Sequence, residues 1–259
     1  MEFQSNPFLV WQIIPGFVLL GIGLYVRSRA IKKRETNVFS LLMFGAALWS
    51  FANAVQLLSP EFEWQAFWSH FTYAGIMIVP TAWCLLTVKL TGIFRTAFER
   101  VGRRIWLIPT FLYLLHLTNF IHGQFFHESE LVFAGGYVSL ENTYGPLFFL
   151  HTVYSYSVMV LGMAILAASI YSNFKRYGIQ VYGLLMGALA PLLGNVYYLF
   201  GPLPVGFPDP TPIIFTVTGL AFAWAIFGGQ ILTVVPFAHD AIVRRLATGI
   251  IILDGERNV

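Results

Sequence analysis

The feature that most constrains this chain is a series of long apolar stretches that carry almost no charge. The segments Gln180–Phe200 and Ile213–Val235 contain no Lys, Arg, Asp or Glu. Each is long enough to cross a hydrocarbon core of roughly 30 Å as a helix. Only 10% of the residues are charged, against roughly 25% in an average soluble domain. The sequence therefore predicts a membrane protein built from helices.

Hydropathy along the whole chain predicts seven transmembrane helices, and hence an all-α membrane protein with the fold of a seven-transmembrane helix bundle. The expected spans are Phe8–Val26, Asn37–Leu58, Phe67–Leu90, Ile105–Phe120, Pro146–Ser172, Ile179–Phe200 and Pro212–Val234. The fourth is the shortest and carries Pro109 near its start. Seven spans place the two termini on opposite sides of the membrane.

The basic residues predict the orientation of this bundle. All 15 Lys and Arg residues lie in the loops after spans one, three and five or in the C-terminal tail. The charged side chains on the other side are all acidic, and they include Glu61, Glu128, Glu141 and Asp209. The positive-inside rule then puts the N-terminus outside and the C-terminus in the cytoplasm. Topology and contact with anionic lipid explain the basic loops, so we expect the lipid bilayer as a partner and no nucleic acid.

Two local patterns predict how the bundle is closed and packed. In the long outer loop, Leu131–Phe133 and Tyr137–Leu140 flank Ala-Gly-Gly, which indicates a short extracellular β-hairpin that is either a cap or a passive connector. Small residues at helical spacing indicate packing surfaces. In span six these are Gly183, Gly187, Ala190 and Gly194, and in span seven they are Gly219 and Ala223.

Polar side chains gather in the outer halves of the spans and supply the candidate ligand-binding residues. These are His70, Tyr73, His116, Asn119, His122, His151, Tyr154, Asn195, Tyr198 and Asp209. The pairs 70/73, 116/119 and 151/154 are three residues apart, which puts each pair on one helix face. Two interpretations stay open: a polar pocket that opens outward, or interhelical hydrogen bonds that only hold the bundle together. Asp209 begins the sequence Asp-Pro-Thr-Pro, a helix start signal that also suits an anchor to Asn195 or Tyr198.

The sequence lacks the residues that several classes of function require. His116, His122, His127 and His151 have none of the spacings typical of metal ligands, so we expect no metal and no cofactor. Span seven has no Lys to attach retinal, and the spans hold no series of carboxylates for proton transport. Catalytic motifs are absent from the cytoplasmic side. Cys84 is the single cysteine, which excludes an internal disulfide.

The chain resembles the N-terminal seven-helix sensor region of prokaryotic histidine kinases over nearly its whole length. The resemblance rests on Ala47–Trp49, Tyr73–Gly75 with Pro80, Thr118–His122, Gly145–Phe149 with Tyr154, Gln180, Gly187, Pro191, Asn195, Tyr198, Asp209–Pro212, Phe215, Gly219 and Pro236–Asp240. It departs from the family at Gln124–His127, where relatives often carry a Trp after the histidine of span four. Asp240–Val259 resembles the opening of a PAS domain. The resemblance therefore implies two parts: a seven-transmembrane sensor domain at residues 1–236, and a cytoplasmic linker with the truncated start of a PAS domain at residues 237–259.

The resemblance implies a transmembrane signal receptor in a prokaryotic cell membrane, the sensory input region of a two-component sensor histidine kinase. It implies a homodimer that senses an unknown small-molecule or membrane-derived signal and reaches a response regulator through a kinase domain outside this chain. The residues expected to transmit the signal are Gly219, Pro236 and Asp240. Two alternatives stay open: the same sensor feeding a diguanylate cyclase, and a small-solute transporter or channel, which would need a polar path through the inner half.

Overall fold

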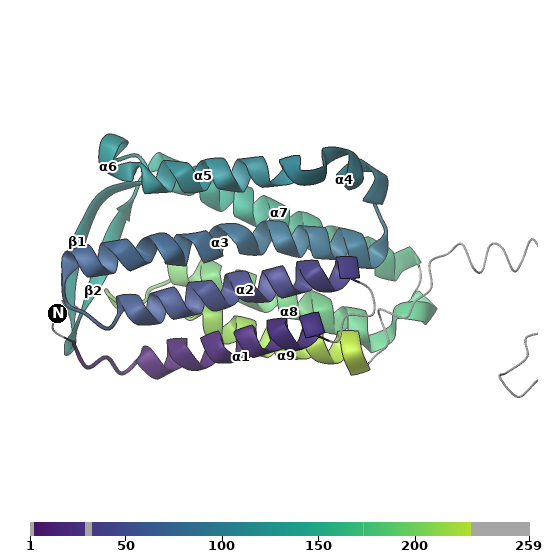
Figure 1. Cartoon of the computed structure of the whole chain (residues 1–259), viewed down its shortest axis with the longest axis horizontal. Coiled ribbons are helices and arrows are strands. Elements are labelled where there is room, and N and C mark those ends of the chain that lie inside the picture. Colours follow the sequence, from purple (N-terminus) through teal and green to yellow (C-terminus); the bar gives the residue numbers. More distant parts are fainter. Residues whose placement is uncertain (1–2, 29–32, 173, 229–259) are drawn as a thin grey trace, which may run out of the picture.

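A computed structural model describes residues 3–28, 33–172 and 174–228, and Figure 1 shows its long helices lying side by side with a β-hairpin across one end. We call the end that carries the hairpin the hairpin end. The opposite end, where the last turns of the first and third helices carry Arg27 and Lys89, is the basic end. The main helices are α1 (Leu9–Ser28), α2 (Lys33–Gln56), α3 (Phe62–Thr91), α5 (Leu107–Leu117), α7 (Pro146–Ser172), α8 (Phe174–Phe200) and α9 (Thr211–Gly228). Short helices α4 (Arg95–Val101), η1 (Gly102–Trp106) and α6 (Asn119–His122) flank α5.

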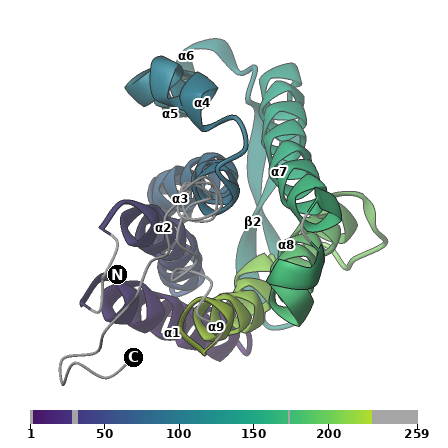
Figure 2. The same cartoon turned by 90° about the vertical axis from the view of Figure 1, so that its right-hand side faces the viewer.

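Six of the long helices form a closed ring. Each contacts the next in the order α1, α2, α3, α7, α8 and α9, and α9 returns to α1. Figure 2 shows this ring from its basic end, with α5 outside it beside α3. The last helix along the chain therefore packs against the first, and the ring surrounds a central space that the hairpin crosses.

Four helices in the described part of the chain are long and apolar enough to cross a membrane: α1, α2, α3 and α7. The sixth and seventh expected spans correspond to α8 and α9, whose described apolar segments are shorter, at Leu185–Phe200 and Thr211–Ala223. The fourth expected span is not one helix. It is divided into η1, α5 and α6, and Thr118 separates α5 from α6 with φ −92° and ψ 12°.

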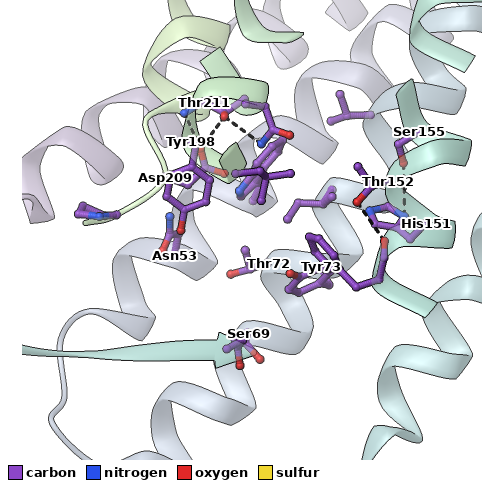
Figure 3. A pocket seen from close by; sticks show the side chains of 18 of the residues that line it. Asn53, Ser69, Thr72, Tyr73, His151, Thr152, Ser155, Tyr198, Asp209 and Thr211 are labelled. Carbon is purple, nitrogen blue, oxygen red and sulfur yellow. Dashed lines mark hydrogen bonds between the residues drawn. The ribbon is translucent and has the colours of Figure 1, made fainter. Parts of the chain in front are cut away.

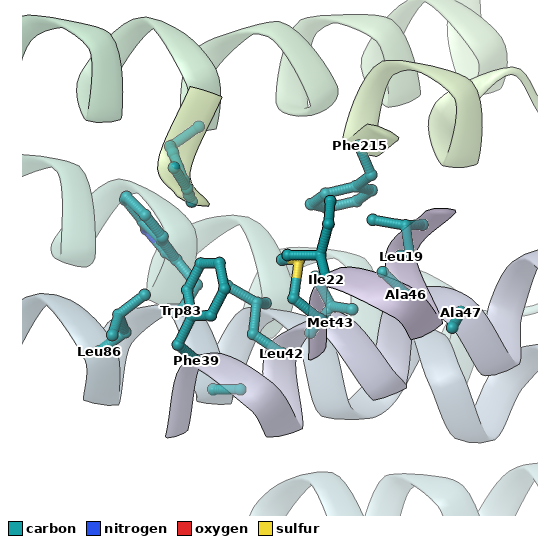
Figure 4. Packing of buried hydrophobic residues seen from close by; sticks show 14 of the residues in the cluster. Leu19, Ile22, Phe39, Leu42, Met43, Ala46, Ala47, Trp83, Leu86 and Phe215 are labelled. Carbon is teal, nitrogen blue, oxygen red and sulfur yellow. The ribbon is translucent and has the colours of Figure 1, made fainter. Parts of the chain in front are cut away.

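The main apolar cluster fills the basic half of the ring. Leu19 and Ile22 of α1, Phe39 and Met43 of α2, and Trp83 of α3 are almost completely buried there (Figure 4). The Trp83 indole stacks on Phe222 of α9 with ring centroids 5.6 Å apart, and its Nε1–H donates to the carbonyl of Met159 at 3.2 Å. Close-packed protein interiors contain few voids larger than a water molecule. The space that remains lies toward the hairpin end.

Small residues let the helices of the ring approach closely. A Cβ on Gly187 of α8 would lie 2.6 Å from the Phe222 ring, and one on Gly194 would clash with Ile214 of α9. Gly219 of α9 faces Met43 of α2, where an added Cβ would lie 3.1 Å from the sulfur. These three glycines pack as the sequence predicted, whereas Gly183 has no neighbour within 4 Å.

The hairpin consists of β1 (Phe126–Ala134) and β2 (Tyr137–Tyr144), paired antiparallel and longer than the predicted segment. Gly135 and Gly136 form the two-residue turn with φ of 59° and 118°, a conformation that suits glycine. The free edge of β2 is paired by two glutamine side chains. Gln4 accepts from the N–H of Val138 at 2.7 Å, and Gln65 accepts from the N–H of Leu140 at 2.7 Å. The hairpin is thereby fixed to the bundle as a roof.

Candidate functional site

A cavity of about 150 Å³ lies inside the ring between the hairpin and the apolar cluster. Its lining comes from α2, α3, β2, α7, α8, the segment before α9, and α9 itself. Figure 3 shows Asn53, Tyr198, Asp209 and Thr211 on one side, His151, Thr152 and Ser155 on the other, and Thr72 and Tyr73 between them. The main polar lining residues are Asn53, Gln56, Ser69, Thr72, Tyr73, Ser139, Glu141, Asn142, Tyr144, His151, Thr152, Ser155, Tyr156, Asn195, Tyr198, Asp209 and Thr211.

The start of α9 forms one wall of this cavity. The Asp209 carboxylate accepts the backbone N–H of Thr211 at 2.9 Å and also its hydroxyl, an arrangement that begins the helix. Asn195 of α8 donates to the Thr211 hydroxyl oxygen at 3.3 Å and accepts from the Tyr156 hydroxyl of α7 at 2.9 Å. Asp209 therefore serves both expected roles, helix start and anchor, and the anchor reaches Asn195 through Thr211.

The same wall is also joined to α1. The Gln12 side-chain amide donates to the Asp209 backbone carbonyl at 2.8 Å, and the Gln12 backbone carbonyl accepts from the Ser50 hydroxyl of α2. Gln12 is 1% exposed. Hydrogen bonds therefore connect the first turn of α9 with α1, α2, α7 and α8, so a change at this turn reaches five helices of the ring.

The electrostatic character of the cavity is set by two carboxylates. Asp209 is 8% exposed, and burial raises its pKa to about 6, against the opposing effect of the bonds from Thr211. Glu141 lies on the exposed side of β2 and accepts the N–H of Gly206 at 3.3 Å. In the described part of the chain, the cavity lining contains no Lys or Arg. Burial, with Glu141 and Asp209 adding, raises the pKa of Tyr144 to about 12.

The roof of the cavity is β2, and it is tied to the segment before α9. Ser139, Leu140 and Glu141 line the cavity. The Tyr137 hydroxyl donates to the Gly206 carbonyl at 3.0 Å, and Gly206 has φ 76°. A Cβ on Gly206 would lie 2.8 Å from Ala134 of β1, so glycine allows both the backbone conformation and the close approach of this segment to the hairpin. Of the two roles left open for the hairpin, the structure favours the cap.

The floor of the cavity is formed mainly by aromatic rings. Trp49 of α2 and Phe215 of α9 meet edge to face with centroids 6.0 Å apart, and Met159 of α7 lies beside them in the lining. Below them the stacked pair Trp83 and Phe222 fills the ring. In the described residues, the cavity is thus bounded by packed aromatic side chains on the side of the basic end.

The structure places five of the ten candidate ligand-binding residues in the cavity lining. These are Tyr73, His151, Asn195, Tyr198 and Asp209. They come from α3, α7, α8 and the segment before α9, so the structure brings together side chains that are far apart in the sequence.

The other five candidates lie outside the lining and bind protein groups. His70 and His116 hydrogen-bond to each other at 3.1 Å between α3 and α5. Asn119 accepts the N–H of Phe125 at 2.8 Å and donates to the carbonyl of Phe126, which begins the hairpin. His122 bonds to the Leu115 carbonyl at 3.0 Å, and Tyr154 bonds to Thr81 at 3.0 Å. Two of these bonds join long helices, α3 with α5 and α3 with α7, and the bonds of Asn119 and His122 stay within the segment from α5 to β1.

Sequence reasoning missed several lining residues. Ser69 with Thr72, and Thr152 with Ser155, are each three apart and present hydroxyls to the cavity. Counting Ser and Thr at helical spacing would have found them. Glu141 gave no such signal, because only the register of the hairpin brings it over the cavity.

The described residues contain no group of three His, Cys, Asp or Glu side chains that could hold a metal ion. Cys84 is a buried free thiol. Gly219 lies in the described part of α9, whereas Pro236, Asp240 and the whole segment 237–259 lie outside the described residues.

Comparison with known proteins identifies the class of this bundle. The model of a family described as the N-terminal 7TM region of histidine kinase matches residues 12–236. No curated protein matches the chain at a significant level. The chain belongs to this histidine kinase family, whose seven-transmembrane region is the sensory part of the kinase.

Proposed function

We propose that this chain is a transmembrane signal receptor that binds a small molecule in the cavity under the hairpin and passes the signal through α9 to a cytoplasmic output module. Family membership supports the sensory role. The receptor would lie in a prokaryotic cell membrane as a multi-pass protein, act as a homodimer, and address a response regulator through a kinase domain outside this chain.

The proposed topology has seven spans, the N-terminus and hairpin outside, and the C-terminus in the cytoplasm. The positions of the described basic residues support it. Arg27 and Lys89 lie in the last turns of α1 and α3, and Arg95, Arg103 and Arg104 follow in α4 and η1. Figure 1 shows the ends of α1 and α3, and α4, at the basic end. The positive-inside rule puts that end in the cytoplasm. The cavity under the hairpin then faces the outside.

The observation that carries the proposal is that the cavity is lined by the first turns of α9. Asp209, Thr211 and Phe215 all border it, and α9 is the helix that leads toward the C-terminus. A ligand shifts a conformational equilibrium only if it binds the two states with different affinity. A molecule that contacts this turn meets that requirement when the turn differs between the two states. In the proposed route the signal continues past Gly219 to Pro236 and Asp240, into a PAS domain.

A transporter or channel is the alternative from another class. It needs a polar path beyond the cavity, and the floor formed by Trp49, Phe215 and the pair Trp83–Phe222 opposes one. Sequencing the gene beyond Val259 separates the remaining outputs. A PAS domain followed by a histidine-bearing helix pair and an ATP-binding domain would support the kinase, and a cyclase domain would change only the output.

The test of the receptor is a cavity-filling substitution in the full-length protein. Ser155 of α7 is 6% exposed and lines the cavity, whereas Val153 on the same helix is 63% exposed and lies outside the lining. We expect Ser155→Phe to change the rate of autophosphorylation in membranes, and Val153→Phe to leave it unchanged. If Ser155→Phe folds and the kinase rate equals that of Val153→Phe, the cavity does not control output.

A further inference from the structure

We propose that the ligand of this cavity is a small organic ammonium ion, held between the Asp209 carboxylate and the aromatic walls. The inference rests on the proposed function, because it names the chemical class of the molecule that the receptor would sense. Three properties of the cavity carry it: charge, unpaired polar groups and aromatic lining.

The charged side chains in the described lining are all acidic. Among the described residues of the lining, the ionisable carboxyl groups are those of Glu141 and Asp209, and no Lys or Arg lies there to pair with either. The lining lies wholly within 49–80, 139–159 and 191–215, and these parts of the sequence contain no Lys or Arg at all. A buried carboxylate without a cation is costly. A ligand that brings a positive charge removes that cost, and a ligand that brings a negative charge adds to it.

Buried polar groups in the lining lack protein partners. Asn53 is 9% exposed and makes no side-chain hydrogen bond to a described residue, and Figure 3 shows its amide directed into the cavity beside Tyr198 and Asp209. The Nε1–H of Trp49, 5% exposed, also has no partner among the described residues. Buried polar groups are almost always bonded. These two therefore indicate a polar molecule that can donate to and accept from them.

Aromatic side chains share the cavity lining with the two carboxyl groups. Tyr144 of β2 and Tyr198 of α8 both interact electrostatically with Asp209 and with Glu141. Tyr73, Trp49 and Phe215 are further aromatic residues of the lining. Ring faces attract an ammonium group, and quaternary ammonium ions are commonly recognised in this way. Aromatic rings with carboxylates and no basic side chain suit a cation better than a neutral or anionic molecule.

The volume limits the size of the ligand. A cavity of 150 Å³ admits a molecule of about the size of benzene, or slightly larger if the side chains rearrange. Choline, with an ammonium group and one hydroxyl, is a probe of suitable size. Its ammonium can face Asp209 while its hydroxyl meets Asn53 or Trp49. The same ammonium chemistry also occurs in lipid head groups.

The experiment compares three probes of similar shape and different charge. Choline is the cation, 3,3-dimethyl-1-butanol is its neutral counterpart, and 3,3-dimethylbutanoate is the anion. Affinity is measured by calorimetry at pH 7.5 on the chain in dodecyl maltoside, a detergent with an uncharged sugar head group. We expect choline to bind at least about tenfold more tightly than the alcohol, because charge-assisted contacts are worth more than neutral ones. The anion should bind most weakly.

Asp209→Asn is the decisive variant, because the amide oxygen can still accept the Thr211 N–H that begins α9. We expect this variant to lower the affinity for choline about tenfold and to leave the affinity for the alcohol nearly unchanged. Titration with a short-chain phosphatidylcholine separates a lipid head group from a free amine. Equal affinity for choline and the alcohol, undiminished choline affinity in Asp209→Asn, or no choline binding each overturns the ammonium proposal. The receptor itself is judged separately, by the kinase rate of Ser155→Phe.

Discussion

Replacing Asp209 by Asn should remove a pH-dependent penalty from the folded protein. Burial raises the pKa of Asp209 from 3.8 to about 6, so the folded state prefers the protonated carboxyl. Its contribution to stability is fully present below pH 4 and is lost as the pH rises to 6. Two pKa units correspond to about 3 kcal/mol. At pH 7.5 we therefore expect Asp209→Asn to exceed wild type in unfolding free energy by up to about 3 kcal/mol.

The assay is equilibrium unfolding in detergent between pH 4 and 8, followed by helical circular dichroism, for wild type and variant side by side. The difference between the two curves isolates Asp209, because all other titratable groups are the same in both proteins. We expect a difference near zero at pH 4 that grows to its full size by pH 7.

Glu141→Gln is the matched control, since its carboxyl lies on the exposed side of β2. It should change the unfolding free energy by less than about 0.5 kcal/mol at every pH. If wild type and Asp209→Asn have parallel pH profiles, the carboxyl is solvated and the reasoning about its burial is wrong. Added choline should flatten the wild-type profile, since a bound cation favours the ionised form.

Three further substitutions test the packing and the roof. Gly75→Ala places a Cβ 2.6 Å from backbone atoms of α2 and should cost about 1–3 kcal/mol of unfolding free energy, whereas Gly21→Ala, with nothing within 4 Å, should cost none. Gln65→Leu removes the buried amide that binds the edge of β2; we expect a loss of about 2–4 kcal/mol and faster hydrogen exchange in β2. Asn119→Ala should likewise expose the start of β1 to exchange. Unchanged exchange in both variants would mean that neither side chain holds the roof.

The candidate site was only partly predictable, because helical spacing says which residues share a face and nothing about what lies opposite. Tyr73 and His70 were paired by spacing, yet Tyr73 lines the cavity while His70 bonds to His116 on α5. His116 and Asn119 were also paired by spacing, but they lie on two different helices. The helix ends at Leu117, so Asn119 begins a new turn and binds the hairpin instead.

The sequence alone determined the class of this protein. Uncharged apolar stretches, the segregation of Lys and Arg, and the Gly-Gly turn are local or additive properties, and they predict a helical membrane bundle, a proposed orientation and the hairpin without knowledge of any contact. Tertiary structure alone decided the cavity. Its existence depends on the closed ring from α1 to α9, on the register that brings Glu141 over the opening, and on Gln12 and Thr211 joining Asp209 to four other helices. These contacts join residues up to 197 positions apart, and no local pattern specifies which distant side chains will meet.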